Sequence, residues 1–241
     1  MRTPIRAWVL LAGLLCHGTA TATLITYTGL GGDFITPTLD NPAPTTTTFK
    51  IPVNDLAIVA PGDSVWVTLN GLLYPYAADL QVSLSLYSPL DVFEKGGDLF
   101  NQIGVVNMGD PGYSSQFGGD YAFNSSYAGD LWDAALQAQG TSDIVSSGSY
   151  RTTTLGSNSN DKLSSMFLGL PIDGTWVLTI VDYFPPFNGG IPAYAPGITS
   201  WDLTIQATGS AVPEPSTAIA VFLFIGLMMG SRGRCLTRHT D

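Results

Sequence analysis

Histidine and cysteine are scarce in this chain of 241 residues, and both lie only near its ends. The cysteines are Cys16 and Cys235, and the histidines are His17 and His239. The segment 23–211 therefore cannot form a disulfide, a Ser-His-Asp or Cys-His nucleophile pair, or a metal site built from imidazole or thiolate. Only carboxylate chemistry, or a hydroxyl paired with a lysine, remains for catalysis. The sequence predicts a protein that is not an enzyme.

Positive charge is also scarce. Seventeen acidic residues, nearly all of them Asp, stand in the segment 23–211 against four basic ones, Lys50, Lys95, Arg151 and Lys162. A surface so acidic repels phosphate backbones, which argues against nucleic-acid binding. It suits a well-solvated exported protein, or one that binds hard divalent cations through carboxylate oxygens.

The first residues have the organisation of a secretory signal peptide. Arg2 and Arg6 precede an apolar core over residues 7–15, and Ala20 and Ala22 form a small-x-small cleavage site. A charged start, a short apolar core and such a site are the three parts of a signal peptide. We therefore expect residues 1–22 to be removed on export.

The C-terminal end has three parts in a fixed order. A linker over 210–217 contains a Pro-Glu-Pro motif, and a hydrophobic segment over 218–230 precedes a basic end over 231–241. The apolar run is shorter than the roughly 20 residues of a comfortable membrane span, and the arginines after it favour the cytoplasmic side. The motif residues are Val212, Pro213, Glu214, Pro215 and Ser216.

This tail resembles a PEP-CTERM sorting signal, and an ordinary tail anchor is the alternative. The resemblance implies an exosortase-type processing enzyme as partner and membrane attachment through the tail before processing. It also implies delivery to the envelope, outer surface or extracellular matrix of a Gram-negative bacterium. Proteins with this signal tend to accompany exopolysaccharide production.

The middle of the chain has the alternation of β-strands. Leu80, Val82, Leu84 and Leu86 alternate with polar residues, which is the pattern of a half-buried strand. Gly, Pro, Asn, Asp and Ser clusters separate such runs, and only residues 130–139 could form a short helix. We expect an N-terminal arm or first strands over 23–60 and an all-β sandwich over 61–209.

Two matching strands give the most specific internal pattern. Each has Trp, Leu and Ile at alternate positions, which predicts a shared core with both indoles on one sheet face. The six core residues are Trp176, Leu178, Ile180, Trp201, Leu203 and Ile205.

With these strands the region from about Leu80 to Ala207 resembles the P domain (P/Homo B) of subtilisin-like proprotein convertases. The motifs that carry the resemblance are Asp79-Leu80-Gln81-Val82-Ser83-Leu84, Tyr121-Ala122-Phe123-Asn124, Leu163-Ser164-Ser165-Met166-Phe167, Gly174-Thr175-Trp176 and Ser200-Trp201-Asp202-Leu203. The resemblance implies a jelly-roll β-sandwich of roughly eight strands. A P domain normally accompanies a protease, and no upstream segment of this chain is long enough to be one.

Loop carboxylates are the candidate metal ligands, because some P domains hold structural calcium in this way. An alternative is that the same residues cap turns. The four candidates are Asp130, Asp133, Asp173 and Asp182. Pairs of carboxylates could instead serve a glycoside-active enzyme. The pairs considered are Asp130 with Asp133 and Asp79 with Asp91.

The favoured function is an exported, non-catalytic envelope or extracellular-matrix protein that is associated with polysaccharide. Aromatic residues in Gly-rich loops add to this reading, since such rings stack on sugars in many binding modules. The alternative is a P-like module that binds or stabilises an exported subtilisin-like protease in trans. A carboxylate-based glycoside-active enzyme is the least favoured reading.

Overall fold

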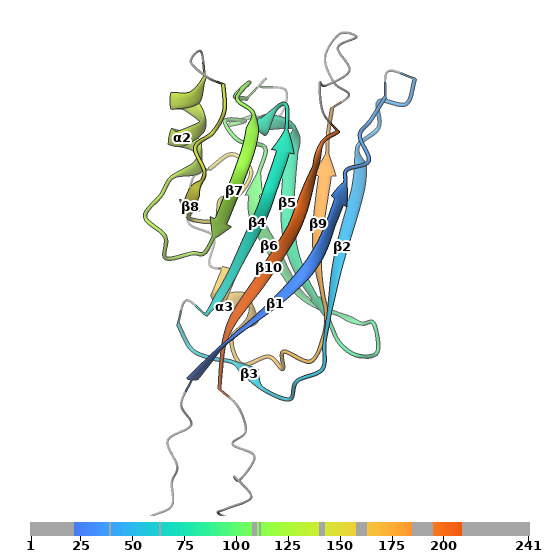
Figure 1. Ribbon diagram of the computed structural model, residues 1–241, viewed down its shortest axis with the longest axis vertical. Helices are drawn as coiled ribbons and strands as arrows, with labels where there is room; N and C mark the ends of the chain where they lie inside the picture. The colour runs from blue at the N-terminus through green and yellow to red at the C-terminus, as the bar shows by residue number, and fades with distance from the viewer. Residues whose placement is uncertain are drawn as a thin grey trace, which may run out of the picture. The chain divides into compact units, whose positions relative to one another are not determined.

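The computed structural model describes residues 22–38, 40–62, 64–107, 110, 112–139, 143–157, 163–184 and 195–208. Residues 22–208 form one compact unit. Two packed β-sheets make up this unit, which is therefore an all-β sandwich, as the sequence predicts. Figure 1 shows one sheet in front of the other, with helix α2 at one end (Figure 1).

The larger sheet has six strands in the order β1-β10-β4-β7-β8, with β3 beside β10. All its pairs are antiparallel except β7 with β8. The strands are β1 (Ala22–Asp33), β3 (Ile58–Val59), β4 (Val65–Tyr74), β7 (Phe117–Phe123), β8 (Gly148–Tyr150) and β10 (Gly197–Thr208).

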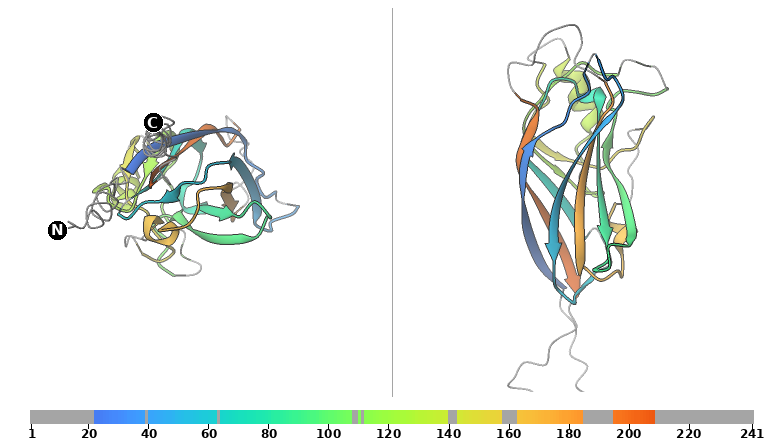
Figure 2. Two further views of the ribbon diagram at one scale, coloured as in Figure 1. Left: turned by 90° about the horizontal axis from the view of Figure 1, so that it is seen from below. Right: turned by 90° about the vertical axis from the view of Figure 1, so that its right-hand side faces the viewer.

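The smaller sheet has four antiparallel strands in the order β2-β9-β5-β6. Its edge strand β2 lies beside β1 at one side of the sandwich, without pairing to it (Figure 2). The strands are β2 (Thr45–Val53), β5 (Leu80–Tyr87), β6 (Phe93–Asn101) and β9 (Gly174–Asp182). The helices are η2 (Ala77–Asp79), α2 (Leu131–Ala138) and α3 (Leu163–Phe167).

The core lies between the inner faces of the two sheets. In β5 the buried apolar residues Leu80, Val82, Leu84 and Leu86 alternate strictly with half-buried residues, which confirms the period predicted for this strand. Trp176 and Trp201 are both fully buried, and Phe167 of α3 packs against the Trp176 ring with 4.9 Å between centroids. The Leu and Ile residues that follow each indole are buried as well.

The predicted common face for the two indoles is wrong. Trp176 lies on β9 in the four-stranded sheet, whereas Trp201 lies on β10 in the six-stranded sheet. The connection between these strands crosses from one layer to the other, so the indoles enter the same core from opposite sides. Strand periodicity fixes which residues face inward and carries no information about the sheet to which a strand belongs.

The predictions for the short helix, the number of strands and the N-terminal arm concern described residues, whereas those for the two ends of the chain largely do not. The predicted short helix is α2. The described residues form ten strands, more than the roughly eight that the resemblance implies. Residues 23–60 contribute β1, β2 and β3 to the sandwich. Ala22 begins β1, while Ala20 and the sorting motif over 212–216 lie outside the described residues. The described residues contain no helix long and apolar enough to cross a membrane.

Candidate binding groove and acidic pocket

An open groove of about 750 Å³ runs between the edge strands β1 and β2. It exists because the two strands belong to different sheets and do not pair with each other. Its walls combine hydroxyls, half-buried aromatic rings and backbone, and Lys50 is the one charged side chain among the described residues that line it. The lining residues are Thr26, Tyr27, Thr28, Gly29, Leu30, Gly31, Thr48, Phe49, Lys50, Ile51 and Pro52.

A buried donor lies directly under this groove. The Trp201 indole nitrogen Nε1 is buried and has no hydrogen-bond partner in the part of the chain that the structure describes. It is the atom nearest to the point where a β-carbon on Gly29 would stand, and Ile51 Cγ1 is 2.8 Å from the same point. Gly29 and Ile51 both line the groove, so an indole N–H lies behind its wall.

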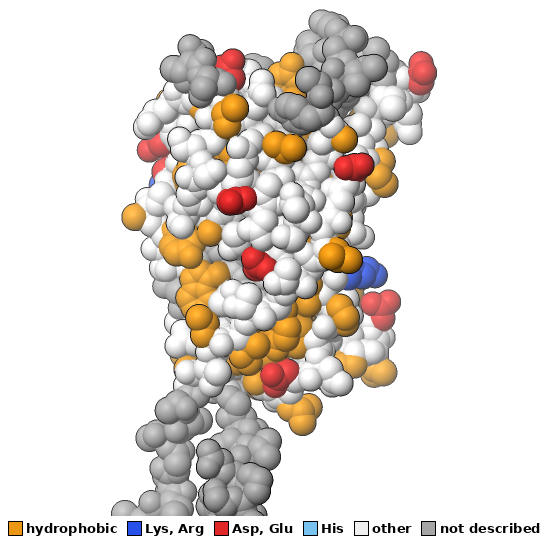
Figure 3. Space-filling model, viewed as in Figure 1, with side chains coloured by type: hydrophobic (Ala, Val, Ile, Leu, Met, Phe, Trp, Pro, Cys, Tyr) orange, Lys and Arg blue, Asp and Glu red, His pale blue; other side chains and the backbone are white. Residues whose placement is uncertain are grey.

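The outer face of the larger sheet beside the groove carries a ladder of polar side chains. Thr26 Oγ1 and Thr204 Oγ1 are 2.9 Å apart, and Thr28 Oγ1 donates to Asp202 at 2.6 Å. Asn70 Nδ2 donates to the same Asp202 carboxylate at 3.0 Å. In Figure 3 this face is mostly uncharged, with carboxylates scattered over it (Figure 3).

A second site is a small acidic pocket at one end of the smaller sheet. Asp182 ends β9, and Asp79 ends η2 just before β5. The β5–β9 register pairs Leu80 with Asp182, which brings the two carboxyls to the same edge. Both residues line a pocket of about 10 Å³, and so does Tyr74. That volume is about what one water molecule needs, so a sugar ring does not fit.

Burial controls the electrostatics of this pocket. Desolvation raises the pKa of Asp79, and the neighbouring Asp182 raises it further. Desolvation also raises the pKa of Asp182, against a lowering by the Tyr74 hydroxyl and the Phe184 N–H. The pKa of Tyr74 is raised by burial and by the Asp182 charge. All three shifts disfavour bare negative charge in the pocket.

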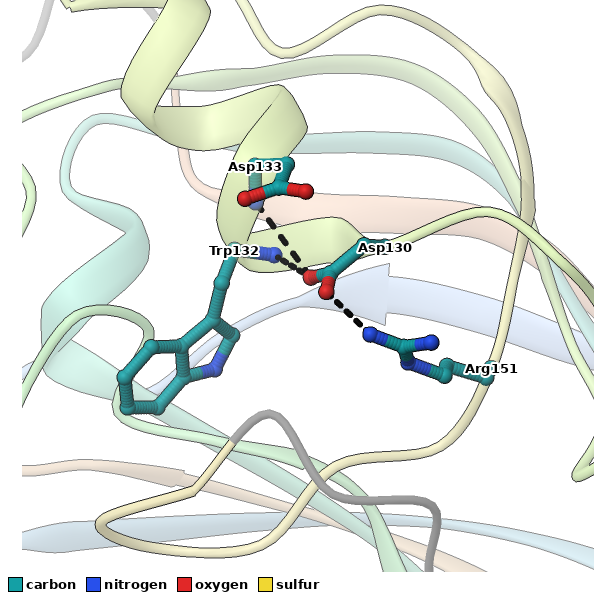
Figure 4. A network of polar contacts seen from close by, with 4 residues as sticks. All are labelled: Asp130, Trp132, Asp133 and Arg151. Carbon is teal, nitrogen blue, oxygen red and sulfur yellow. Dashed lines mark hydrogen bonds and ion pairs between the residues drawn. The ribbon is translucent and has the colours of Figure 1, made fainter.

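The structure gives Asp130 and Asp133 a role at the start of α2. Asp130 is the N-cap, and its Oδ1 accepts from the backbone N–H of Trp132 at 2.9 Å and of Asp133 at 3.3 Å (Figure 4). Its Oδ2 forms an ion pair with Arg151. The arrangement satisfies two amides that a helix start leaves without partners, which is the capping role that Asp commonly plays.

The four predicted calcium ligands do not come together. Asp173 precedes β9 and Asp182 ends it, so nine residues of extended strand, roughly 30 Å, separate them. Asp173 instead lines a cavity of about 200 Å³ that also includes Glu94. Among the described residues no three acidic, histidine or cysteine side chains are grouped to hold a metal. The structure does not place the four predicted ligands in one site. Calcium binding itself stays a prediction.

Neither predicted acid/base pair is arranged as a glycosidase pair. Asp79 and Asp91 lie beyond opposite ends of β5, a strand of eight residues, so they are more than about 25 Å apart and cannot flank one glycosidic bond. Asp130 is engaged as the cap of α2 and in the ion pair with Arg151, whereas Asp133 takes part in the cap only through its backbone N–H. The pairing of Asp79 with Asp182 was missed, although both residues border strands of the same predicted sandwich.

Several of the loop aromatics that suggested sugar binding are core residues. Five of them are buried: Tyr74, Phe117, Tyr121, Phe123 and Trp132. The groove rings Tyr27 and Phe49 lie instead on strands whose threonine-rich sequence drew no attention as a binding site. The alternation of Thr with aromatic residues in these two segments was the available signal.

Comparisons with known proteins leave the family open. No protein-family model and no curated protein matches the chain. A solved complex of a serine protease of Aeromonas sobria with a chaperone is similar at a TM-score of 0.36 and 17% identity, over 84% of this chain and 29% of that one. The structure of the protease alone gives 0.34 and 17%, over 83% and 29%. The chain thus spans less than a third of that protein, and TM-scores this low assign no function.

Proposed function

We propose that the protein is an exported, non-catalytic module of the bacterial envelope or extracellular matrix, and that the groove between β1 and β2 binds an extended polysaccharide. The observation that carries the proposal is the open, nearly uncharged groove itself. Six consecutive residues of β1 line it, which gives a length of roughly 20 Å. That length suits several consecutive units of a polymer better than one small molecule.

The chemistry of the groove favours sugar over other polymers. The Thr48 hydroxyl can exchange hydrogen bonds with sugar hydroxyls, and the exposed parts of the Tyr27 and Phe49 rings offer apolar surface for the faces of the rings. The Thr26 and Thr28 hydroxyls, which already bond Thr204 and Asp202, can still accept hydrogen bonds from a sugar. A single lysine is too little positive charge for a nucleic-acid backbone.

The lining also favours binding over hydrolysis. The described residues of the groove include no Asp or Glu, so the groove itself offers no carboxylate pair to flank a glycosidic bond. Delivery to the envelope rests on the sequence of the two ends. An exosortase-type enzyme would process the tail, which would hold the protein at the membrane until then.

Affinity electrophoresis of the purified exported protein tests the groove. The gels contain extracellular polysaccharide from the producing bacterium, with dextran gels as the comparison. We expect the wild type to be retarded by the native polymer, and Tyr27→Ala to lose at least tenfold in affinity. Tyr87→Ala is the matched control, because Tyr87 is a half-buried strand tyrosine outside the groove.

Two outcomes would contradict the proposal. Equal retardation of wild type and Tyr27→Ala would place binding elsewhere on the molecule. Recovery of one stoichiometric exported protease from envelope extracts, with no retention of polysaccharide, would favour the in-trans protease reading instead.

A further inference from the structure

The acidic pocket at the ends of β5 and β9 contains an oxygen that lacks a good hydrogen bond. Asp182 is 1% exposed, and its Oδ1 accepts a long hydrogen bond of 3.3 Å from the Phe184 N–H. Its Oδ2 is buried and makes no hydrogen bond of good geometry in the described part of the chain, although the Tyr74 hydroxyl is close to the same carboxyl and lowers its pKa. Burying a carboxylate oxygen without a good hydrogen bond is costly, so such an atom in a built pocket points to a missing ligand.

The protein supplies no cation to this pocket from its described residues. The ion pair between Arg151 and Asp130 lies elsewhere, at the start of α2. Asp79 lies in the same pocket as Asp182, so two carboxyls face a space that holds about one atom-sized occupant. With no basic partner the two carboxylates repel each other when both are ionised, and a bound cation would remove that repulsion.

We propose that this pocket binds one calcium ion through the carboxylates of Asp79 and Asp182. Calcium takes oxygen ligands of mixed kinds in flexible geometry, and the hydroxyls of Thr36 and Tyr74 line the same pocket. Magnesium fits less well because it demands near-ideal octahedral geometry. Of the four ligands expected from sequence only Asp182 takes part. The inference is independent of the polysaccharide groove.

A cation here would join segments that are distant in sequence. The pocket is formed by the end of β4, the start of β5, the end of β9 and the residue before β10. The backbone already links two of them, since the Tyr183 N–H donates to the Asp79 carbonyl at 3.0 Å. Calcium would therefore stabilise the fold in a chain segment that has no cysteine.

Terbium luminescence and thermal melting of the exported protein test the site. Tyr74 lines the pocket, so excitation of tyrosine should sensitise a bound terbium ion, and calcium should displace it. We expect the melting temperature to be several degrees higher in millimolar calcium than in chelator at matched ionic strength. Magnesium should produce a smaller rise.

Asparagine variants separate loss of the ion from loss of the fold. Asp79→Asn and Asp182→Asn should each abolish the terbium signal and the calcium-dependent rise. In chelator both should melt no lower than the wild type, because each removes a buried charge. Asp173→Asn is the matched control, since Asp173 lies at the opposite end of β9, and it should behave as the wild type.

The proposal fails on any of three results. The first is a wild-type melting temperature that is the same in calcium and chelator. The second is terbium binding that persists in both Asp79→Asn and Asp182→Asn. The third is an equal loss of signal in Asp173→Asn, which would indicate diffuse binding to the acidic surface.

Discussion

The two buried tryptophans differ in how their polar atoms are satisfied. Trp176 Nε1 donates to the Ile172 carbonyl at 3.0 Å, whereas Trp201 Nε1 is without a partner among the described residues. Both rings are fully buried and belong to one core, so packing rather than hydrogen bonding is their common contribution. At this scale stability depends on the apolar area that each indole removes from water.

Trp176→Ala and Trp201→Ala should each lower the free energy of unfolding by about 3–5 kcal/mol, because each leaves a large cavity in a close-packed core. That loss is a large part of the roughly 5–15 kcal/mol that stabilises a typical domain. Urea unfolding followed by fluorescence and circular dichroism measures it. Wild-type unfolding midpoints in both variants would mean that neither indole supports the core.

Gly29→Ala should destabilise the sandwich by about 1–3 kcal/mol, the usual cost of overpacking. The added methyl would collide with the Trp201 indole and stand 2.8 Å from Ile51 Cγ1. Gly32→Ala is the matched control in the same strand, because its methyl would meet only Phe49 Cε1, at 3.4 Å. Thermal melting compares the two. Equal melting temperatures would show that the wall between β1 and β2 yields easily.

At the scale of elements, helix α2 illustrates how one side chain fixes an end. Asp130 caps the first turn and forms an ion pair with Arg151, which directly follows β8. The Arg151 backbone N–H also donates to the Gly129 carbonyl at 2.9 Å, so main chain and side chain hold the same two segments together. The cap and the ion pair can be separated by substitution.

Asp130→Ala should cost about 0.5–2 kcal/mol through loss of the cap, and Asp130→Asn distinctly less, because Asn caps helices well and loses only a partly exposed ion pair. Chemical unfolding at low and high salt measures both. If Asn cost as much as Ala, and salt reduced the difference from wild type, the ion pair rather than the cap would dominate.

At the scale of the whole molecule, the described sandwich lies between two ends that the sequence assigns to export and sorting. Glu214→Ala should leave export intact and block processing of the tail, because Glu214 is the centre of the Pro-Glu-Pro motif. Mass spectrometry of the surface-localised wild type and variant checks this. An intact peptide from residues 232–241 in the mature wild-type protein would contradict the sorting hypothesis.

Residue pattern by itself determined the fold class and the excluded chemistry. The alternation in the segment 80–87 predicted β5 because a strand with one buried face repeats every two residues. The short helix was predictable from a capping Asp before an apolar run. The absence of histidine and cysteine from residues 23–211 excluded thiolate and imidazole sites whatever the fold.

Only the tertiary structure decided which of these elements meet. Period-two alternation assigns a face to each residue and leaves the sheet unspecified, so Trp176 and Trp201 were expected on one sheet and lie on two. The groove exists because β1 and β2 are edges of different sheets that come together without pairing. Asp79 and Asp182 share a pocket because the pairing of β5 with β9 sets them at one end. Each depends on contacts between distant segments, which local propensity does not encode.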